Sequence, residues 1–363
     1  MKRILGLILV GALAGKTSAQ VTARQPLFTL PTSKTATETA TGTPIYTSAL
    51  GGALEGETYP VTPRFIELEI QNQRVRMFYM DAATGTVGGM APTSPRPMEL
   101  PAVLLLHGKN FSGFYFENVM RALVAQGYRV LVPDQIGFGK SSKPDINYSF
   151  DLLADNTAKL LDALKIERVS VLGHSMGGML AARFALKYPN RVNKLILENP
   201  IGLEDYSQFI PAQSLESVYA RELADTDASK TRAFYGNYFV TWKPEYERFV
   251  AIKARQALGG EWPRVAKSSA LTYQMIINEP VVGEFPQIQV PTLLIIGQAD
   301  RTVVGKNYAS PEATKNLGNY PALGKSAARA IRGAKLAEFA GVGHIPHLEA
   351  PDKFNSTLLE FLK

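Results

Sequence analysis

The sequence predicts an α/β fold with a mostly parallel central sheet, flanking helices and a helical insertion. After Pro101, short apolar runs alternate with segments of helical spacing, which indicates a parallel sheet with right-handed crossovers. The alternation stops after Leu197 and resumes at Thr292. Helical patterns without a good buried strand fill the stretch between, so we expect one sheet domain interrupted by an insertion at about 201–289.

The expected strands and helices can be placed in chain order. Residues 65–79 alternate in polarity and predict two paired strands that turn near Asn72. The run 102–106 is apolar throughout, as in a strand buried on both faces. Further strands are expected at 128–132, 168–172, 192–197, 292–296 and 334–339, and helices at 114–126, 151–164, 176–188, about 325–331 and 352–362.

Composition narrows the classes of protein and of site. The chain has 363 residues, 45% of them hydrophobic, which suits one large domain with an insertion. No basic run carries interleaved aromatics, so nucleic acid is not an expected partner. The absence of cysteine excludes disulfides and thiolate catalysis. None of the four histidines forms a His-x-x-x-His pair, and we expect neither a metal nor a cofactor.

The N-terminus has the pattern of a signal peptide at 1–19. Lys2 and Arg3 precede a short apolar stretch, and Thr17-Ser18-Ala19 predicts cleavage before Gln20. The apolar stretch is short for a membrane span, although an uncleaved anchor is the alternative. Without Lys2, Arg3 and Lys16 the net charge of +7 becomes 7 − 3 = +4. We therefore expect an exported protein, periplasmic or secreted, with no stable transmembrane segment after cleavage.

Low-complexity composition separates this segment from the predicted domain. Residues 20–60 are rich in Thr, Ala, Gly and Pro, and we expect a flexible leader or loosely packed arm there. The sheet domain is expected at 61–200 and 290–363, with a Gly/Pro/Thr-rich loop at 82–97.

A Gly-x-Ser-x-Gly motif stands at an expected strand-to-helix junction. It places Ser175 on a sharp turn beside a helix N-terminus, where free N–H groups favour negative charge. Gly173 and Gly177 avoid clashes where strand and helix approach closely. The flanking elements make Ser175 a candidate nucleophile.

Five stretches together resemble the α/β-hydrolase fold family in its group with a helical cap, over about 61–363. They are His107-Gly108, Asp134 to Ser141, Gly173 to Gly178, Gly297 to Asp300, and Gly343 to Glu349. The resemblance implies a hydrolase and leaves the substrate open. A helical cap over Ser175 is then the expected role of 201–289, because loops after strand ends surround ligand sites in such sheets.

A serine nucleophile needs a base, and the base needs an acid that orients it. In this family the chain order is Ser, acid, His, and only His344 and His347 follow Ser175. Family resemblance and loop position favour His344; His347 is expected to support the loop or line the site wall. The family's acid position corresponds to Asp300. The alternative acids are Glu198 and, further into the insertion, Asp205.

Acyl transfer also needs donors for the developing oxyanion. The backbone N–H of Met176, directly after the nucleophile, is the first expected donor. For the second, the resemblance points to the Lys109 N–H, with Asn110 as the alternative. His107 is expected to organise this loop, and no chemical role is expected for His174.

These features predict an exported serine esterase, or a hydrolase of a related acyl compound, that acts through an acyl-serine. Carbon–carbon bond hydrolysis, amide or peptide cleavage and haloperoxidase-like chemistry share the same triad. Epoxide hydrolases and haloalkane dehalogenases are disfavoured because the resemblance requires aspartate where Ser175 stands. The non-enzyme alternative is a ligand-binding protein on this fold. Aromatic residues in the insertion favour a small, partly apolar substrate, and the oligomeric state stays open.

Overall fold

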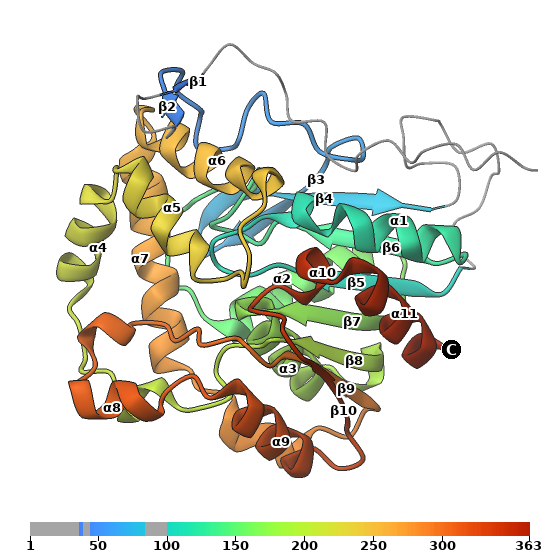
Figure 1. Ribbon diagram of the computed structural model, residues 1–363. Coiled ribbons are helices and arrows are strands. Elements are labelled where there is room, and N and C mark those ends of the chain that lie inside the picture. Colours follow the sequence, from blue (N-terminus) through green and yellow to red (C-terminus); the bar gives the residue numbers. More distant parts are fainter. Residues whose placement is uncertain (1–35, 39–43, 84–99) are drawn as a thin grey trace, which may run out of the picture. The chain divides into compact units, whose positions relative to one another are not determined.

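The computed structural model describes residues 36–38, 44–83 and 100–363, which contain an eight-stranded sheet (Figure 1). The predicted signal peptide and most of the 82–97 loop lie outside the described residues. The strand order is β10-β9-β8-β7-β5-β6-β4-β3. The strands are β3 (Arg64–Ile70), β4 (Gln73–Ala82), β5 (Ala102–Leu106), β6 (Arg129–Pro133), β7 (Val169–His174), β8 (Val192–Glu198), β9 (Thr292–Gly297) and β10 (Lys335–Phe339).

The sheet is antiparallel at one edge and parallel elsewhere. β3 pairs with β4, and β4 with β6, in antiparallel register. Gln71 and Asn72 form the β3–β4 turn with φ of 48° and 62°. Positive φ at both residues is typical of two-residue hairpin turns, because it matches the twist of the flanking strands. From β6 to β10 all neighbours are parallel, and every residue of β5, β6, β7 and β9 is buried. The predicted α/β class is confirmed.

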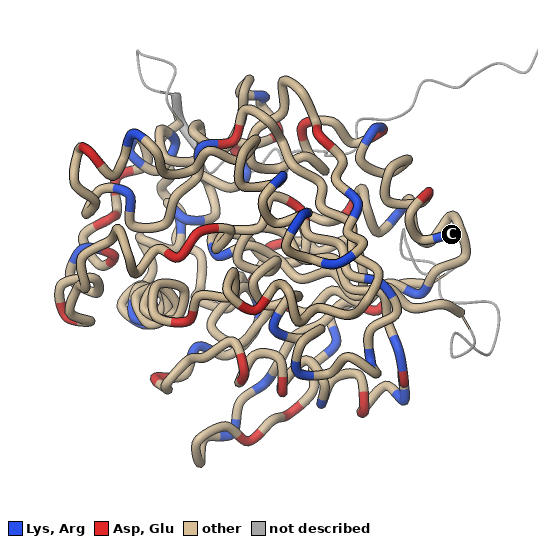
Figure 2. Tube along the Cα trace, turned by 90° about the horizontal axis from the view of Figure 1, so that it is seen from below, with Lys and Arg blue, Asp and Glu red and all other residues tan. Residues whose placement is uncertain are grey.

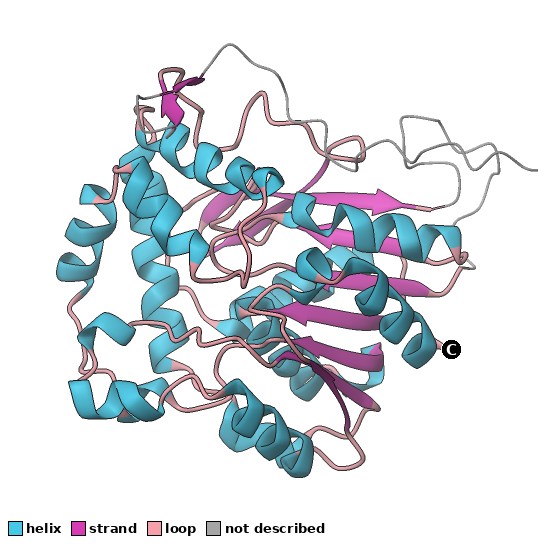
Figure 3. Cartoon of the chain, viewed as in Figure 1, coloured by secondary structure: helices cyan, strands magenta, loops and turns pink. Residues whose placement is uncertain are grey.

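Helices cover both faces of the sheet (Figures 1 and 3), and the sheet separates two apolar cores. One core contains residues of α2 (Phe150–Ala163), α3 (Met176–Lys187) and α9 (Tyr320–Ala330). The other contains residues of α1 (Glu117–Ala125), α10 (Pro346–Glu349) and α11 (Pro351–Leu362). This two-sided covering explains why the parallel strands are apolar throughout instead of alternating.

Four helices lie between β8 and β9, at the end of the sheet toward which the parallel strands point (Figure 1). They are α4 (Leu215–Ala224), α5 (Ala228–Gly236), α6 (Glu247–Ala257) and α7 (Trp262–Asn278). Helix α4 packs on α7, and α5 packs on α6. The carboxyl ends of β7 and β9 carry the candidate residues, so these helices and the candidate site share one edge of the sheet.

The segment before β3 differs from the expectation. A small hairpin, β1 (Ala36–Glu38) with β2 (Pro44–Tyr46), precedes residues that pack on the insertion. Leu50 and Leu54 are buried, and Arg255 pairs with Glu57 at 2.9 Å. The expected loose packing of 20–60 is therefore wrong for 44–60. Single apolar anchors on irregular backbone hold this stretch, and they leave no periodicity in the sequence.

The remaining short elements connect these layers. α8 (Pro311–Asn316) lies between β9 and α9, and short 3-10 helices occur at Gly113–Phe116, Pro189–Arg191, Tyr206–Gln208, Pro244–Tyr246, Val282–Gln287 and Lys306–Tyr308. Cationic and anionic residues are interleaved along the described chain (Figure 2). Among the helices that the structure describes, none has the length and apolarity needed to cross a membrane.

Candidate active site

Ser175 stands on a strained turn between β7 and α3. Its backbone has φ +56° and ψ −121°, a region that non-glycine residues rarely adopt. A Cβ on Gly173 would collide with the Gly177 carbonyl, and one on Gly177 would collide with the Leu106 carbonyl. Only glycine at both positions lets β7, α3 and β5 approach this closely. This tight turn places Ser175 at the edge of the sheet.

Three predicted residues meet in one hydrogen-bonded chain. Ser175 Oγ lies 3.0 Å from His344 Nε2, and His344 Nδ1 lies 2.7 Å from Asp300 Oδ2. A neutral ring in which Nδ1–H donates to Asp300 leaves Nε2 free to accept the Ser175 proton. All three residues are buried, with 7%, 1% and 2% of their surfaces exposed. The arrangement brings the predicted nucleophile, base and orienting acid within hydrogen-bond distance of one another.

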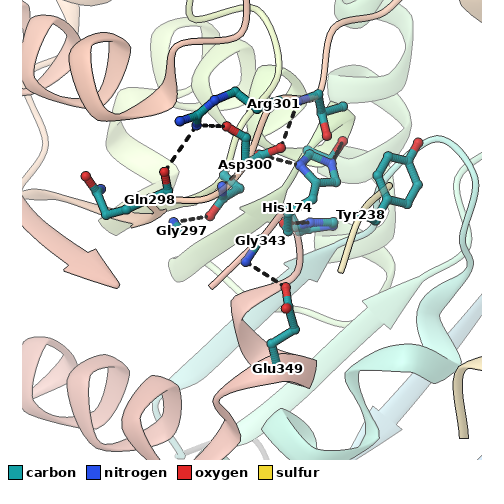
Figure 4. Close-up of polar contacts among 12 residues, drawn as sticks. His174, Tyr238, Gly297, Gln298, Asp300, Arg301, Gly343 and Glu349 are labelled. Atoms are coloured by element: carbon teal, nitrogen blue, oxygen red, sulfur yellow. Dashed lines mark hydrogen bonds and ion pairs between the residues drawn. The ribbon is translucent and has the colours of Figure 1, made fainter. Parts of the chain in front are cut away.

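The Asp300 carboxylate is held by donors on the loop after β9 and at the end of β8 (Figure 4). Its Oδ2 also accepts from Asn199 Nδ2 at 2.8 Å, and Oδ1 accepts from the Thr302 N–H at 2.8 Å. Burial raises the pKa of Asp300, but His344 and these donors outweigh burial and leave its pKa below the ordinary value. Asp300 is therefore held as an anion facing His344.

Backbone contacts from the insertion fix the His344 loop. The His344 N–H donates to the Tyr238 carbonyl at 2.8 Å, and the Tyr238 ring centroid lies 4.8 Å from that of His344. Glu349 accepts from the Gly343 N–H at 2.8 Å (Figure 4). It also accepts from the Val240 N–H at 2.9 Å. The insertion thus contacts the predicted base directly.

The predicted oxyanion donors flank Ser175. Met176 is the first residue of α3, so its N–H has no carbonyl one turn earlier in the helix. A Cβ on Gly108 would lie 3.1 Å from the Ser175 Cβ, so the segment that leads into Lys109 passes next to Ser175. The Met176 and Lys109 amides therefore lie on the two segments that border Ser175.

A buried network that the sequence did not predict joins this loop to the elbow. The Gly108 N–H donates to Tyr115 Oη at 2.9 Å, and Tyr115 Oη lies 2.8 Å from His174 Nδ1. His174 Nε2 lies 2.8 Å from the His344 carbonyl, which can only accept, so Nε2 carries the proton. Burial lowers the pKa of His174 well below its ordinary value. The neutral His174 ties the Gly108 and His344 loops together.

The other candidate residues are not part of the Ser175–His344–Asp300 hydrogen-bond chain. His347 Nδ1 pairs with Glu198 Oε1 at 2.8 Å, and Glu198 also accepts the His347 N–H at 2.9 Å. Asp205 accepts from the Ser207 N–H at 3.0 Å at the start of a 3-10 helix. His107 accepts the Gln135 N–H at Nε2, and burial lowers its pKa. No group of three His, Asp or Glu side chains within the described ranges could hold a metal ion.

Asn199 is the main contributor to the site that sequence reasoning missed. Its Nδ2 binds Asp300, and its Oδ1 accepts the Gly297 N–H at 2.8 Å. It also has φ +34°, which asparagine tolerates better than most residues. The only available signal was its position directly after Glu198, at the end of a strand.

Comparison with known proteins assigns the fold to a class. A family model described as the alpha/beta hydrolase fold matches residues 101–351, and the chain belongs to that family. A solved structure of a probable hydrolytic enzyme from Pseudomonas aeruginosa is 43% identical, with a TM-score of 0.81 over 87% of this chain and 99% of that one.

Two curated relatives are also hydrolases. The chain is 29% identical to the 2-hydroxy-6-oxononadienedioate/2-hydroxy-6-oxononatrienedioate hydrolase of Paraburkholderia xenovorans, over 83% of this chain and 95% of the relative. It is 30% identical to the 2-hydroxy-6-oxo-6-phenylhexa-2,4-dienoate hydrolase of Comamonas testosteroni, over 72% of this chain and 87% of the relative. Its relatives are thus hydrolytic enzymes of the same family.

Proposed function

We propose that this chain is a serine hydrolase that cleaves an ester or a related acyl compound through an acyl-serine. The observation that carries the proposal is the 3.0 Å separation between Ser175 Oγ and His344 Nε2, on a ring whose other nitrogen lies 2.7 Å from Asp300. A hydroxyl is a weak nucleophile at neutral pH unless such a base removes its proton.

Acylation follows from the orientation of these groups. Ser175 Oγ attacks the substrate carbonyl while its proton passes to His344 Nε2, and Asp300 stabilises the imidazolium that forms. The carbonyl oxygen becomes an oxyanion that accepts from the Met176 and Lys109 amides. The tetrahedral intermediate then collapses, the bond to the leaving group breaks, and the leaving group takes the proton from His344. The products of this half-reaction are the acyl-serine and the free alcohol.

Deacylation repeats the steps with water. His344 takes a proton from a water molecule, whose oxygen attacks the acyl carbonyl, and the same two amides stabilise the second oxyanion. The Ser175 oxygen leaves and recovers its proton from His344. The carboxylic acid product and the free enzyme result.

Carbon–carbon bond hydrolysis is the second candidate, and the names of the two curated relatives favour it. The distinguishing experiment compares kcat/KM for p-nitrophenyl esters with that for a 2-hydroxy-6-oxo-dienoate. We expect a burst of p-nitrophenol equal to the enzyme concentration, and no burst from Ser175→Ala. Turnover of the dienoate alone would select the second candidate, and turnover of neither compound would remove both.

We further propose that the insertion acts as a cap over Ser175. The contacts of Tyr238 with His344 support this role, as does its hydroxyl, which accepts from Asn110 Nδ2 at 2.8 Å. Both tryptophans of the chain, Trp242 and Trp262, belong to this segment. A slowly hydrolysed phosphonate should therefore shift the intrinsic fluorescence, and an unchanged spectrum on complete labelling would argue against a moving cap.

Export is the third part of the proposal, and it rests on the N-terminal sequence pattern alone. N-terminal sequencing of the protein recovered from periplasm or medium should find a start at or near Gln20. A chain that begins at Met1 in those fractions would contradict cleavage.

A further inference from the structure

A cavity lies beside the candidate site, between the loop after β5 and the insertion helices. Its volume is about 110 Å³, several times the roughly 10–15 Å³ that one water molecule needs by the same measure. Lys109, Asn110 and Phe111 are among its lining residues, and they directly follow Gly108, the residue that lies against Ser175. Ser175 itself is not in the lining. The cavity is thus placed to hold a part of the substrate that does not react.

The cavity lining contains more cationic than anionic side chains. Lys109, Lys143 and Lys253 face one carboxylate, that of Glu222. Lys143 donates to the Gly139 and Ser141 carbonyls at 2.8 and 3.1 Å, and Lys253 pairs with Asp225 at 2.6 Å. The lining itself therefore carries three lysines and one carboxylate, and carboxylates outside it, Asp225 beside Lys253 and Asp134, Glu55 and Glu261 around Lys143, offset part of that charge.

The Lys109 ammonium is only partly compensated by its neighbours. Its ammonium donates to Ser269 Oγ at 2.6 Å, and its nearest carboxylate, that of Glu222, lies at 3.9 Å, beyond hydrogen-bond distance. Burial lowers its pKa, Glu222 opposes that shift, and Lys253 adds to it. A buried ammonium retains free donors here, and an anion brought into the cavity would restore the stabilisation that burial removes.

The rest of the lining is largely apolar. Phe111, Phe114 and Phe249 form one aromatic wall, in which the Phe111 and Phe249 ring centroids are 5.1 Å apart. Trp262 and Val265 of α7 face the same space. An occupant that matches this lining combines an apolar body with an anionic head group.

We propose that this cavity binds the carboxylate of the substrate, through the ammonium groups of Lys109 and Lys253, with its apolar body against the aromatic wall. The inference rests on the proposed function, because it makes the cavity the substrate site of Ser175. The substrate class is then a carboxylate-bearing acyl compound, not a neutral lipid or a simple neutral ester.

The test is calorimetric titration of the wild-type protein with 3-phenylpropionate and with 3-phenylpropionamide. The two probes share the apolar body and differ in the charge of the head group. We expect the carboxylate to bind at least about tenfold more tightly than the amide, as suits hydrogen bonds to charged groups. Equal affinities, or no measurable binding of the carboxylate, would overturn the proposal. The same titrations with Ser175→Ala, in which no acyl-enzyme can form, keep the result independent of any hydrolysis of the probes.

Three variants assign the effect to the cavity. Lys253→Met should remove most of the preference for the carboxylate and leave the affinity for the amide unchanged. Lys109→Met should have the same effect, and it serves as the test if Lys253→Met does not fold. Lys267→Met is the matched control, since Lys267 lies on α7 outside the lining, over the Tyr219 ring. A preference that survives both cavity variants, or that Lys267→Met also abolishes, would refute the assignment.

Discussion

Two histidine–carboxylate pairs lie three residues apart in the same buried region, and they differ in what their second nitrogen meets. His344 Nδ1 contacts Asp300 at 2.7 Å, and His347 Nδ1 contacts Glu198 at 2.8 Å. All four side chains are buried. By distance and burial alone, either pair could supply an oriented base.

The environment of Nε2 separates the pairs. His344 Nε2 faces Ser175 Oγ, whereas His347 Nε2 has no hydrogen-bond partner among the described residues. The His347 ring packs instead between Tyr115 and Phe116, with centroids at 4.7 and 4.8 Å. A histidine–carboxylate pair is thus a candidate base only where its other nitrogen meets a nucleophile; the Glu198 pair fixes the backbone at the start of α10.

The largest effect should come from making the same substitution in both histidines. Glutamine can donate to the paired carboxylate but cannot take up a proton as a base. His344→Gln should lower kcat by roughly 10⁴-fold or more, because triad members act as a unit. His347→Gln should stay within about tenfold of wild type, since it contacts no reacting atom. The measurement is kcat for ester hydrolysis with both variants folded. A larger loss in His347→Gln than in His344→Gln would identify His347 as the base.

The acids should show the same contrast. Asp300→Asn should cost roughly 10⁴-fold in kcat by favouring the wrong imidazole tautomer. Glu198→Gln should instead lower the free energy of unfolding, by about 1–3 kcal/mol, because it weakens two buried hydrogen bonds. Parallel kcat and denaturant measurements separate these outcomes. An inactive but stable Glu198→Gln beside an active Asp300→Asn would identify Glu198 as the acid.

A smaller effect should follow from removing a support of the first pair. Asn199→Ala deletes the donor to Asp300, a hydrogen bond to a charged group, and should reduce kcat by roughly tenfold. Asn193→Ala is the control, because Asn193 lies on β8, the strand that ends directly before Asn199, and its side chain accepts only from Arg168, at 2.7 Å, among the described contacts. Equal activity of the two variants would show that Asn199 does not position Asp300.

The smallest effect concerns stability in acid. The folded pKa of Asp300 lies below its ordinary value of 3.8, so its ionised form stabilises the folded state. That contribution is complete above pH 3.8 and is lost as the pH falls through the folded pKa. Wild type should therefore lose stability more steeply than Asp300→Asn below pH 3.8, as measured by thermal unfolding at stepped pH. Parallel curves would contradict the depressed pKa.

The central sheet could be predicted from the sequence because local patterns encode its strands. The apolar run 102–106 and the Gly-x-Ser-x-Gly motif are short and contiguous, and they predicted a buried strand and the turn at Ser175. The structure puts the three predicted residues, Ser175, His344 and Asp300, within hydrogen-bond reach.

The long-range contacts were not predictable in the same way. Tyr115 and His174 are 59 residues apart, and Asn199 and Asp300 are 101 apart, so no local pattern connects them. The packing of Leu50 and Leu54 was not predicted for a related reason. Isolated apolar residues on irregular backbone form no periodic pattern in the sequence. Such contacts follow from the topology, which brings distant segments to one edge of the sheet.

Fluorophosphonate labelling, mapped by mass spectrometry, tests the central claim most directly, because the probe reacts with an activated serine without any knowledge of the substrate. We predict one adduct on Ser175 in wild type and in folded His347→Gln, and slowing of that reaction by at least about 10³-fold in His344→Gln. An adduct on another serine, or equal labelling of Ser175 in both histidine variants, would contradict the account.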